Sequence, residues 1–142
     1  MKQTEVSKEE IMAVFPKVAE TMADALGCDV EDVKLDVPLI EGLDAESIDF
    51  LDMVFRLERA FKIKIPRGKI MDNARGDLPE SEFEHKGVLT DVGLAQLRSY
   101  LSEVPDSRFK SPMKVADIPR LFTPETFCKL VVRAQKEAAT AA

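Results

Sequence analysis

The chain has 142 residues, a length typical of one compact domain that buries a core of its own. Hydrophobic residues make up 45% of it, with six glycines and no tryptophan, a composition that predicts a compact helical protein rather than a sheet protein or a disordered one. The formal net charge of −6 argues against nucleic acid as a partner, because the phosphates would repel the chain.

Cysteine usage and the polar first residues bear on where the protein works. Cys28 and Cys128 lie about a hundred residues apart with no CxxC spacing, so neither a zinc site nor a disulfide framework is indicated. Residues 1–10 are polar, and no apolar run reaches the length of a membrane span. We therefore expect a cytoplasmic protein with buried thiols, no metal site and no membrane span, and we expect it to be a monomer.

A first helix is predicted to begin near Lys8 and to stop at Gly27. Ser7 and Glu10 have the spacing of a capping box, in which each side chain bonds the other residue's backbone N–H. Pro16 interrupts the helix and predicts a kink or a fresh helix start. Residues 28–46 then hold scattered apolar residues without a steady period, which predicts a long loop pinned to the core.

A second helix is predicted from Ser47, with Pro66 as its stop. It carries two apolar stripes at three- and four-residue steps: Phe50, Met53, Val54, Leu57 and Phe61 form one, and Ile48, Leu51 and Phe55 form the other. Glu46, Asp49 and Asp52 gather near its start and Arg59, Lys62 and Lys64 near its end, the order that a helix dipole favours. The helix thus has more apolar surface than a single core contact needs.

The motif Glu46-Ser47-Ile48-Asp49 resembles the acyl carrier protein family, in which a serine in an Asp-Ser-Leu-Asp-type motif carries a 4′-phosphopantetheine arm. The resemblance covers roughly residues 8–66 and includes Leu26-Gly27, Val33, Leu43, Leu57-Glu58, Phe61 and Ile65-Pro66. It looks most like the specialised carriers that deliver very long or modified acyl chains to lipid assembly. Two residues depart from the family pattern, since Asp44 stands where glycine is usual and Glu46 stands where aspartate is usual.

The resemblance implies that Ser47 receives 4′-phosphopantetheine from coenzyme A through a phosphopantetheinyl transferase. It also implies acyl synthases and acyltransferases as partners, in fatty acid or lipid biosynthesis. The residues expected to dock these enzymes are the acids near the serine and the second apolar stripe, namely Glu46, Asp49, Asp52, Ile48, Leu51 and Phe55. The alternatives are that Ser47 is only the N-cap of its helix and that the acids are only a solvated face.

The rest of the chain predicts an insertion followed by a closing helix. Residues 67–86 are polar and lack an apolar period, and Thr90 can cap a helix that runs to Leu101. Thr123 and Pro124 have the residue types of a helix start, so we expect the closing helix at about residues 123–138 rather than at Leu89–Leu101. The predicted fold is an all-α, acyl-carrier-like bundle of three to four main helices, with a long insertion that carries an extra amphipathic helix. We expect residues 1–142 to form a single carrier domain, with its core at 8–66, the closing helix at 123–138 and the insertion at 67–121.

Catalytic groups are scarce, which argues against an enzyme. His85 is the single histidine and is expected on the surface, and neither cysteine has an activating motif. We therefore expect no catalytic residues and no bond chemistry by the chain itself. A carrier of aminoacyl or polyketide units and an unmodified helical interaction module remain as alternative functions.

Overall fold

The computed structural model describes residues 6–65, 75–76, 78–110 and 112–141, and most of these residues are helical. They divide into two compact units. The bundle unit comprises residues 6–65 and 122–141, and the inserted unit comprises the described residues from 75 to 121. The predicted helical fold class is confirmed, and the single carrier domain stays a prediction.

Helix α1, Lys8–Leu26, begins and ends where the sequence predicts. The Ser7 N–H donates to Glu10 Oε1 at 3.0 Å and the Glu10 N–H donates to Ser7 Oγ at 3.2 Å, so the predicted capping box is present. Gly27 ends the helix in the left-handed region with φ 69°, a conformation that costs glycine little.

Two expectations for the first 46 residues need correction. A fresh helix start at Pro16 is wrong, because α1 runs through this residue. Pro16 is exposed, so water can bind the Met12 carbonyl that the proline leaves without a helical donor. The expected loop at residues 28–46 also contains two short helices, η1 at Val30–Asp32 and α2 at Leu39–Leu43. Each is too short to show an apolar period in the sequence.

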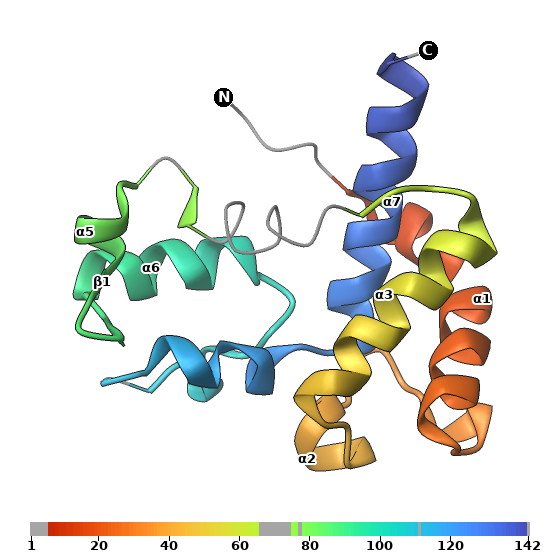
Figure 1. Cartoon of the computed structure of the whole chain (residues 1–142), viewed down its shortest axis with the longest axis horizontal. Coiled ribbons are helices and arrows are strands. Elements are labelled where there is room, and N and C mark those ends of the chain that lie inside the picture. The colour runs from red at the N-terminus through yellow and green to blue at the C-terminus, as the bar shows by residue number, and fades with distance from the viewer. Residues whose placement is uncertain (1–5, 66–74, 77, 111, 142) are drawn as a thin grey trace. The chain divides into compact units, whose positions relative to one another are not determined.

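Helix α1 packs against α3, Ser47–Phe61, and against α7, Pro124–Ala141 (Figure 1). Met53 and Leu57 on α3 are fully buried, as the first apolar stripe predicts. On α3, the Phe50 ring lies 5.8 Å from the ring of Phe122, just before α7, and 6.0 Å from the ring of Phe127, in the first turn of α7. Aromatic rings thus form part of the contact between α3 and α7.

The sequence makes one expectation about the end of α3 and another about the start of α7. Helix α3 stops at Phe61, where Lys62 adopts the left-handed conformation with φ 55°, so Pro66 does not end it as expected. Helix α7 begins at Pro124, as predicted, and the Thr123 N–H donates to Thr126 Oγ1 at 3.1 Å at this buried start. The Lys136 Nζ of α7 lies 2.8 Å from Glu10 Oε2 of α1, so an ion pair links the two helices.

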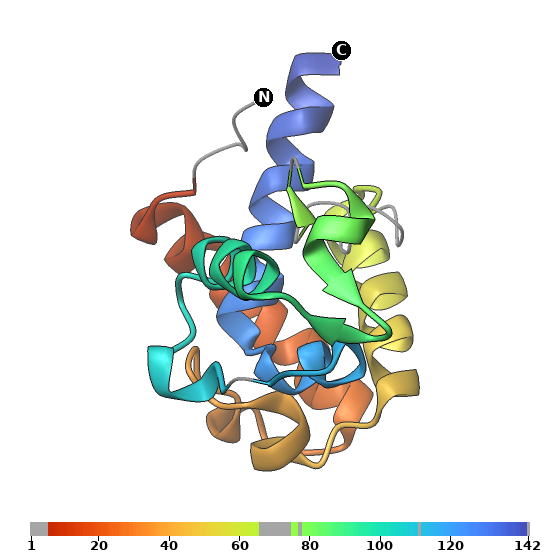
Figure 2. The same ribbon diagram turned by 90° about the vertical axis from the view of Figure 1, so that its left-hand side faces the viewer.

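The inserted unit contains more structure than its polar sequence predicts. Its elements are α5 at Glu80–Phe83, β1 at Glu84–His85, β2 at Val88–Leu89, α6 at Asp91–Tyr100, and the 3₁₀ segments η2 at Asp106–Arg108 and η3 at Val115–Leu121. The strands pair antiparallel and lead into α6 (Figure 2). With two residues in each strand, this hairpin is below the length at which alternation is recognisable.

Helix α6 is capped by Thr90, as predicted, since the Gly93 N–H donates to Thr90 Oγ1 at 2.9 Å. Gly93 allows a close approach to α5, because a Cβ at this position would lie 2.0 Å from the Phe83 carbonyl oxygen. Leu97 and Tyr100 are buried on the predicted apolar face. Val92, which the apolar spacing places on the same face, is 57% exposed, because the first turn of α6 presents Gly93 to α5 instead.

Candidate functional site

The backbone before Ser47 is fixed by the end of α2 (Figure 1). Asp44, at the C-cap of α2, has φ 56° and ψ 29°, which lies in the left-handed region. The next residue, Ala45, is buried, and its N–H donates to the Leu39 carbonyl at 3.0 Å. Aspartate tolerates this conformation better than most residues with a side chain, so it can stand where the acyl carrier pattern has glycine.

Ser47 is the first residue of α3, and its N-cap is Glu46 in an extended conformation with φ −105° and ψ 163°. The alternative that Ser47 caps its own helix is therefore wrong, because the residue before it holds the cap position. Ser47 itself is helical, and its side chain lies outside what the structure describes. The carboxylate of Asp49 accepts the Glu46 N–H at 2.7 Å, and the Asp49 N–H donates to the Glu46 carbonyl at 2.9 Å.

The three predicted docking acids differ in their surroundings. Glu46 is exposed at the helix start. Asp49 is half-buried and bonds back to Glu46, as above. Asp52 pairs with Arg56 one turn further along α3, with Asp52 Oδ2 2.9 Å from Arg56 Nε and both side chains partly exposed. The sequence places these acids close together but reveals neither the internal bond of Asp49 nor the pairing of Asp52.

The second apolar stripe lies at the surface of the described structure. Ile48 is 71% exposed, and Leu51 and Phe55 are each 40% exposed. The stripe starts beside Ser47 and follows α3 for two turns. Apolar side chains that remain in water cost free energy, so a continuous exposed stripe is typical of an interaction surface.

The start of α3 suits a covalently attached phosphodiester. The first backbone N–H groups of a helix have no acceptor within the helix, and the helix dipole is positive at this end. An anion linked at Ser47 would therefore meet favourable charge at the place where the helix begins. The carboxylate of the neighbouring Asp49 is hydrogen-bonded to the Glu46 N–H.

The groups that could favour an enzyme are poorly suited to catalysis. His85 is exposed in β1, as predicted. Burial raises the pKa of the Cys128 thiol to about 12, so this thiol stays protonated near neutral pH. Burial and the nearby Asp32 raise the pKa of Cys28, which is half-buried rather than buried as expected. Within the described residues, no group of histidine, cysteine or acidic side chains has the arrangement of a metal site.

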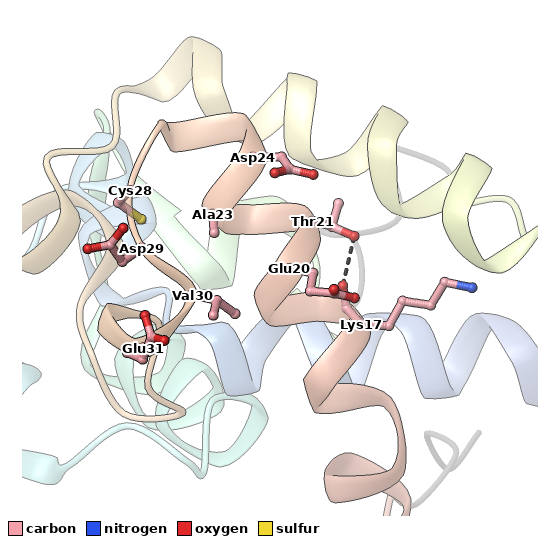
Figure 3. Close-up of a pocket in the computed structure, with 9 residues that line it drawn as sticks. All are labelled: Lys17, Glu20, Thr21, Ala23, Asp24, Cys28, Asp29, Val30 and Glu31. Carbon is pink, nitrogen blue, oxygen red and sulfur yellow. Dashed lines mark hydrogen bonds between the residues drawn. The ribbon is translucent and has the colours of Figure 1, made fainter.

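A cavity of about 510 Å³ lies between the second half of α1 and η1 (Figure 3). None of the predicted site residues lines it; the lining residues are Lys17, Glu20, Thr21, Ala23, Asp24, Cys28, Asp29, Val30 and Glu31. The Thr21 hydroxyl donates to the Lys17 carbonyl at 2.8 Å, the bond drawn in Figure 3, and is thus used within α1.

Comparison with known proteins identifies the region around Ser47. A family described as "Phosphopantetheine attachment site" matches residues 16–75. No solved structure matches the chain. In the described part of the chain, no helix is long and apolar enough to cross a membrane.

Three curated relatives each match somewhat more than a third of the chain. An acyl carrier protein of Campylobacter curvus is 40% identical over 55 residues, 39% of this chain and 71% of the relative. One of Clostridium acetobutylicum is 38% identical over 53 residues, 37% of this chain and 69% of the relative. The acyl carrier protein AcpXL of Rhizobium meliloti is 41% identical over 56 residues, 39% of this chain and 59% of the relative.

These relatives and the attachment-site family agree with the resemblance seen in the sequence, and they establish 4′-phosphopantetheine as the covalent cofactor of this kind of protein. Such proteins carry acyl groups and are not themselves enzymes. The chain belongs to the acyl carrier protein family.

Proposed function

We propose that Ser47 is the attachment point of 4′-phosphopantetheine and that the chain presents an acyl group, held as a thioester, to lipid or fatty acid biosynthetic enzymes. The observation that carries this proposal is the position of Ser47 as the first residue of α3, within the matched attachment-site region. When bound, the cofactor supplies the thiol that forms the thioester. The chain supplies the helix start, the fixed turn before it and an exposed surface beside it.

The test of the attachment point is Ser47→Ala, incubated with coenzyme A and a broad-specificity phosphopantetheinyl transferase. We expect the wild type to gain the mass of the arm and the variant to gain none, with little change in far-ultraviolet circular dichroism. Since Glu46 is the N-cap, the substitution removes no capping side chain, and alanine is a good helix former. A variant that still gains the arm would refute Ser47 as the site.

We propose that partner enzymes dock on the exposed stripe of α3 and on the acids at its start. The exposure of Ile48, Leu51 and Phe55 supports this, as does the exposed Glu46 beside Ser47. The acids steer a basic enzyme surface, an effect that falls with added salt. Changing Glu46, Asp49 and Asp52 to lysine should clearly slow attachment of the arm at low salt. The same change should lower the unfolding temperature only slightly. Equal rates for variant and wild type at low salt would show that the acids are only solvated surface.

The partners would be a phosphopantetheinyl transferase, acyl synthases and acyltransferases. Curated relatives named as acyl carrier proteins, AcpXL among them, favour an acyl cargo over aminoacyl or polyketide units. We propose that the protein works as a monomer in the cytoplasm. Mass spectrometry of the protein purified from its native host would identify the cargo, and an attached aminoacyl or polyketide unit would refute an acyl carrier of lipid synthesis.

We also propose that residues 8–66 and a closing helix at about 123–138 form the carrier, with residues 67–121 as an insertion. Backbone bonds within the bundle unit support this, because the Leu39 N–H donates to the Phe122 carbonyl at 3.1 Å and the Glu125 N–H donates to the Leu35 carbonyl at 3.1 Å. A chain in which a short linker replaces residues 67–121 should fold and accept the arm. Loss of cooperative unfolding in that chain would show that the insertion is part of the core.

A further inference from the structure

The Asp49 carboxylate closes the start of α3 rather than simply facing solvent. It accepts the Glu46 N–H at 2.7 Å, a short distance typical of a hydrogen bond to a charged acceptor. The bond spans Ser47 and Ile48, so the backbone of the serine lies inside a closed ring of chain. Asp49 is the third residue of the helix, the position from which a capping-box side chain reaches back to the N-cap.

We propose that Asp49 is a positioning residue for the attachment reaction, in addition to any role in docking. This inference rests on the proposed function of Ser47. By bonding the Glu46 N–H, Asp49 holds Glu46 extended and keeps Ser47 in the first turn of α3. The serine is then presented in one backbone conformation instead of in a frayed helix end.

The reaction served by this geometry is a phosphoryl transfer. The Ser47 oxygen forms a bond to the phosphorus of the phosphopantetheine half of coenzyme A, and the bond from that phosphorus to the bridging pyrophosphate oxygen breaks. Adenosine 3′,5′-bisphosphate leaves with the bond electrons, and the hydroxyl proton passes to a base of the transferase. Such a displacement depends on the alignment of the attacking oxygen, so loss of a fixed serine backbone slows it.

Two other acids, Asp52 and Glu10, allow a positioning effect to be distinguished from a docking effect. The carboxylate of Asp52 pairs with Arg56 and does not touch the helix start, so its effect on attachment would act through charge alone. Glu10 holds the same capping position in α1 that Asp49 holds in α3, because it accepts the Ser7 N–H at 3.0 Å. Glu10 therefore offers a matched control for the loss of a capping carboxylate at a helix that does not carry Ser47.

The experiment measures the rate of arm attachment by intact mass, with coenzyme A and a broad-specificity phosphopantetheinyl transferase, at low and high salt. The variants are Asp49→Ala, which removes the acceptor, Asp49→Asn, which keeps an acceptor oxygen without the charge, and the control Glu10→Ala. Amide hydrogen exchange of Glu46 gives a second readout that does not depend on the transferase.

Asp49→Ala is expected to slow attachment about fivefold at both salt concentrations, equivalent to about 1 kcal/mol, the size of a typical hydrogen bond. Protection of the Glu46 amide should fall in the same variant. Asp49→Asn should stay within about twofold of the wild type and keep the protection, because the amide oxygen can accept the same bond. Glu10→Ala should lower stability without changing the attachment rate.

Attachment to Asp49→Ala at the wild-type rate would overturn the positioning role. Slow attachment to both Asp49 variants at low salt, with recovery at high salt, would assign the residue to charge steering and would also overturn it. A wild type that never gains the arm, or a Ser47→Ala variant that does, would overturn the proposed function itself, and these outcomes do not depend on any Asp49 variant.

Discussion

If the proposed docking surface is right, one face of α3 serves stability and the other serves partner recognition, and the same substitution made on each face tests this. Leu57 is fully buried and Leu51 is 40% exposed. Leu57→Ala removes about three buried methylene equivalents, worth about 2.4 kcal/mol at about 0.8 kcal/mol each. The cavity left behind raises the expected loss to about 3 to 4 kcal/mol, within the range known for buried leucines.

Leu51→Ala should lower stability less than Leu57→Ala does, and its main effect should be on partner recognition. With 40% of its surface already in water, Leu51 forfeits at most roughly 60% of the transfer energy, about 1.4 kcal/mol, and it leaves no closed cavity. Alanine also recovers a small part of this through its higher helix propensity. If the stripe docks enzymes, Leu51→Ala should nevertheless slow acyl loading of the protein that carries the arm.

Urea unfolding followed by circular dichroism gives both stabilities, and intact mass gives the loading rates. Equal slopes of unfolding free energy against urea concentration would show that the two variants expose the same amount of surface on unfolding as the wild type. The reasoning fails if Leu57→Ala lies within 1 kcal/mol of the wild type, or if Leu51→Ala is the more destabilising of the two. Unchanged loading of Leu51→Ala would remove Leu51 from the docking surface.

Two further predictions concern the helix termini. At Asp44, with φ 56°, a β-branched residue is strained, so Asp44→Val should cost about 1 to 2 kcal/mol in urea unfolding, whereas Asp44→Gly should change stability by less than about 1 kcal/mol; equal effects would contradict the left-handed turn. The hydrogen bond from Lys136 holds the pKa of Glu10 below its ordinary value of 4.5, with a contribution from the Ser7 N–H. The stabilisation by Glu10 is therefore complete above about pH 4.5 and is lost as the pH falls through the lower folded-state pKa. Glu10→Gln should be less stable than the wild type near neutral pH, with a gap that closes in acid; a gap independent of pH would contradict this.

Local sequence patterns predict the helices that begin with a cap and carry a long apolar face. The capping box of Ser7 and Glu10, the Thr90 cap and the start of α7 at Pro124 are confirmed because each depends on residues close together in the chain. The apolar period of α3 also separates Leu57 in the core from Ile48 at the surface. For such elements, local propensity and burial agree.

The sequence does not predict the short elements or the left-handed end of α3, and the reason is physical. Helix α2 and the β1–β2 hairpin have too few residues for a period, and backbone bonds to other segments hold them in place. The Leu89 N–H, for example, donates to the Met113 carbonyl at 2.8 Å. Lys62 ends α3 in a conformation usually associated with glycine, so a proline four residues further on was a misleading signal.

The motif in the local sequence points to Ser47 as the candidate attachment residue, but the backbone conformation around Ser47 depends on distant residues. The turn before Ser47 follows α2, and the Leu39 N–H at the start of α2 bonds the Phe122 carbonyl just before α7. Phe122 also packs its ring against Phe50 of α3. Phe122 thus contacts α2, which precedes the turn before Ser47, through its backbone, and α3, which begins at Ser47, through its side chain. A motif marks where an arm can be attached, whereas the tertiary contacts of Phe122 hold in place α2 and α3, the two helices joined by the turn that leads into Ser47.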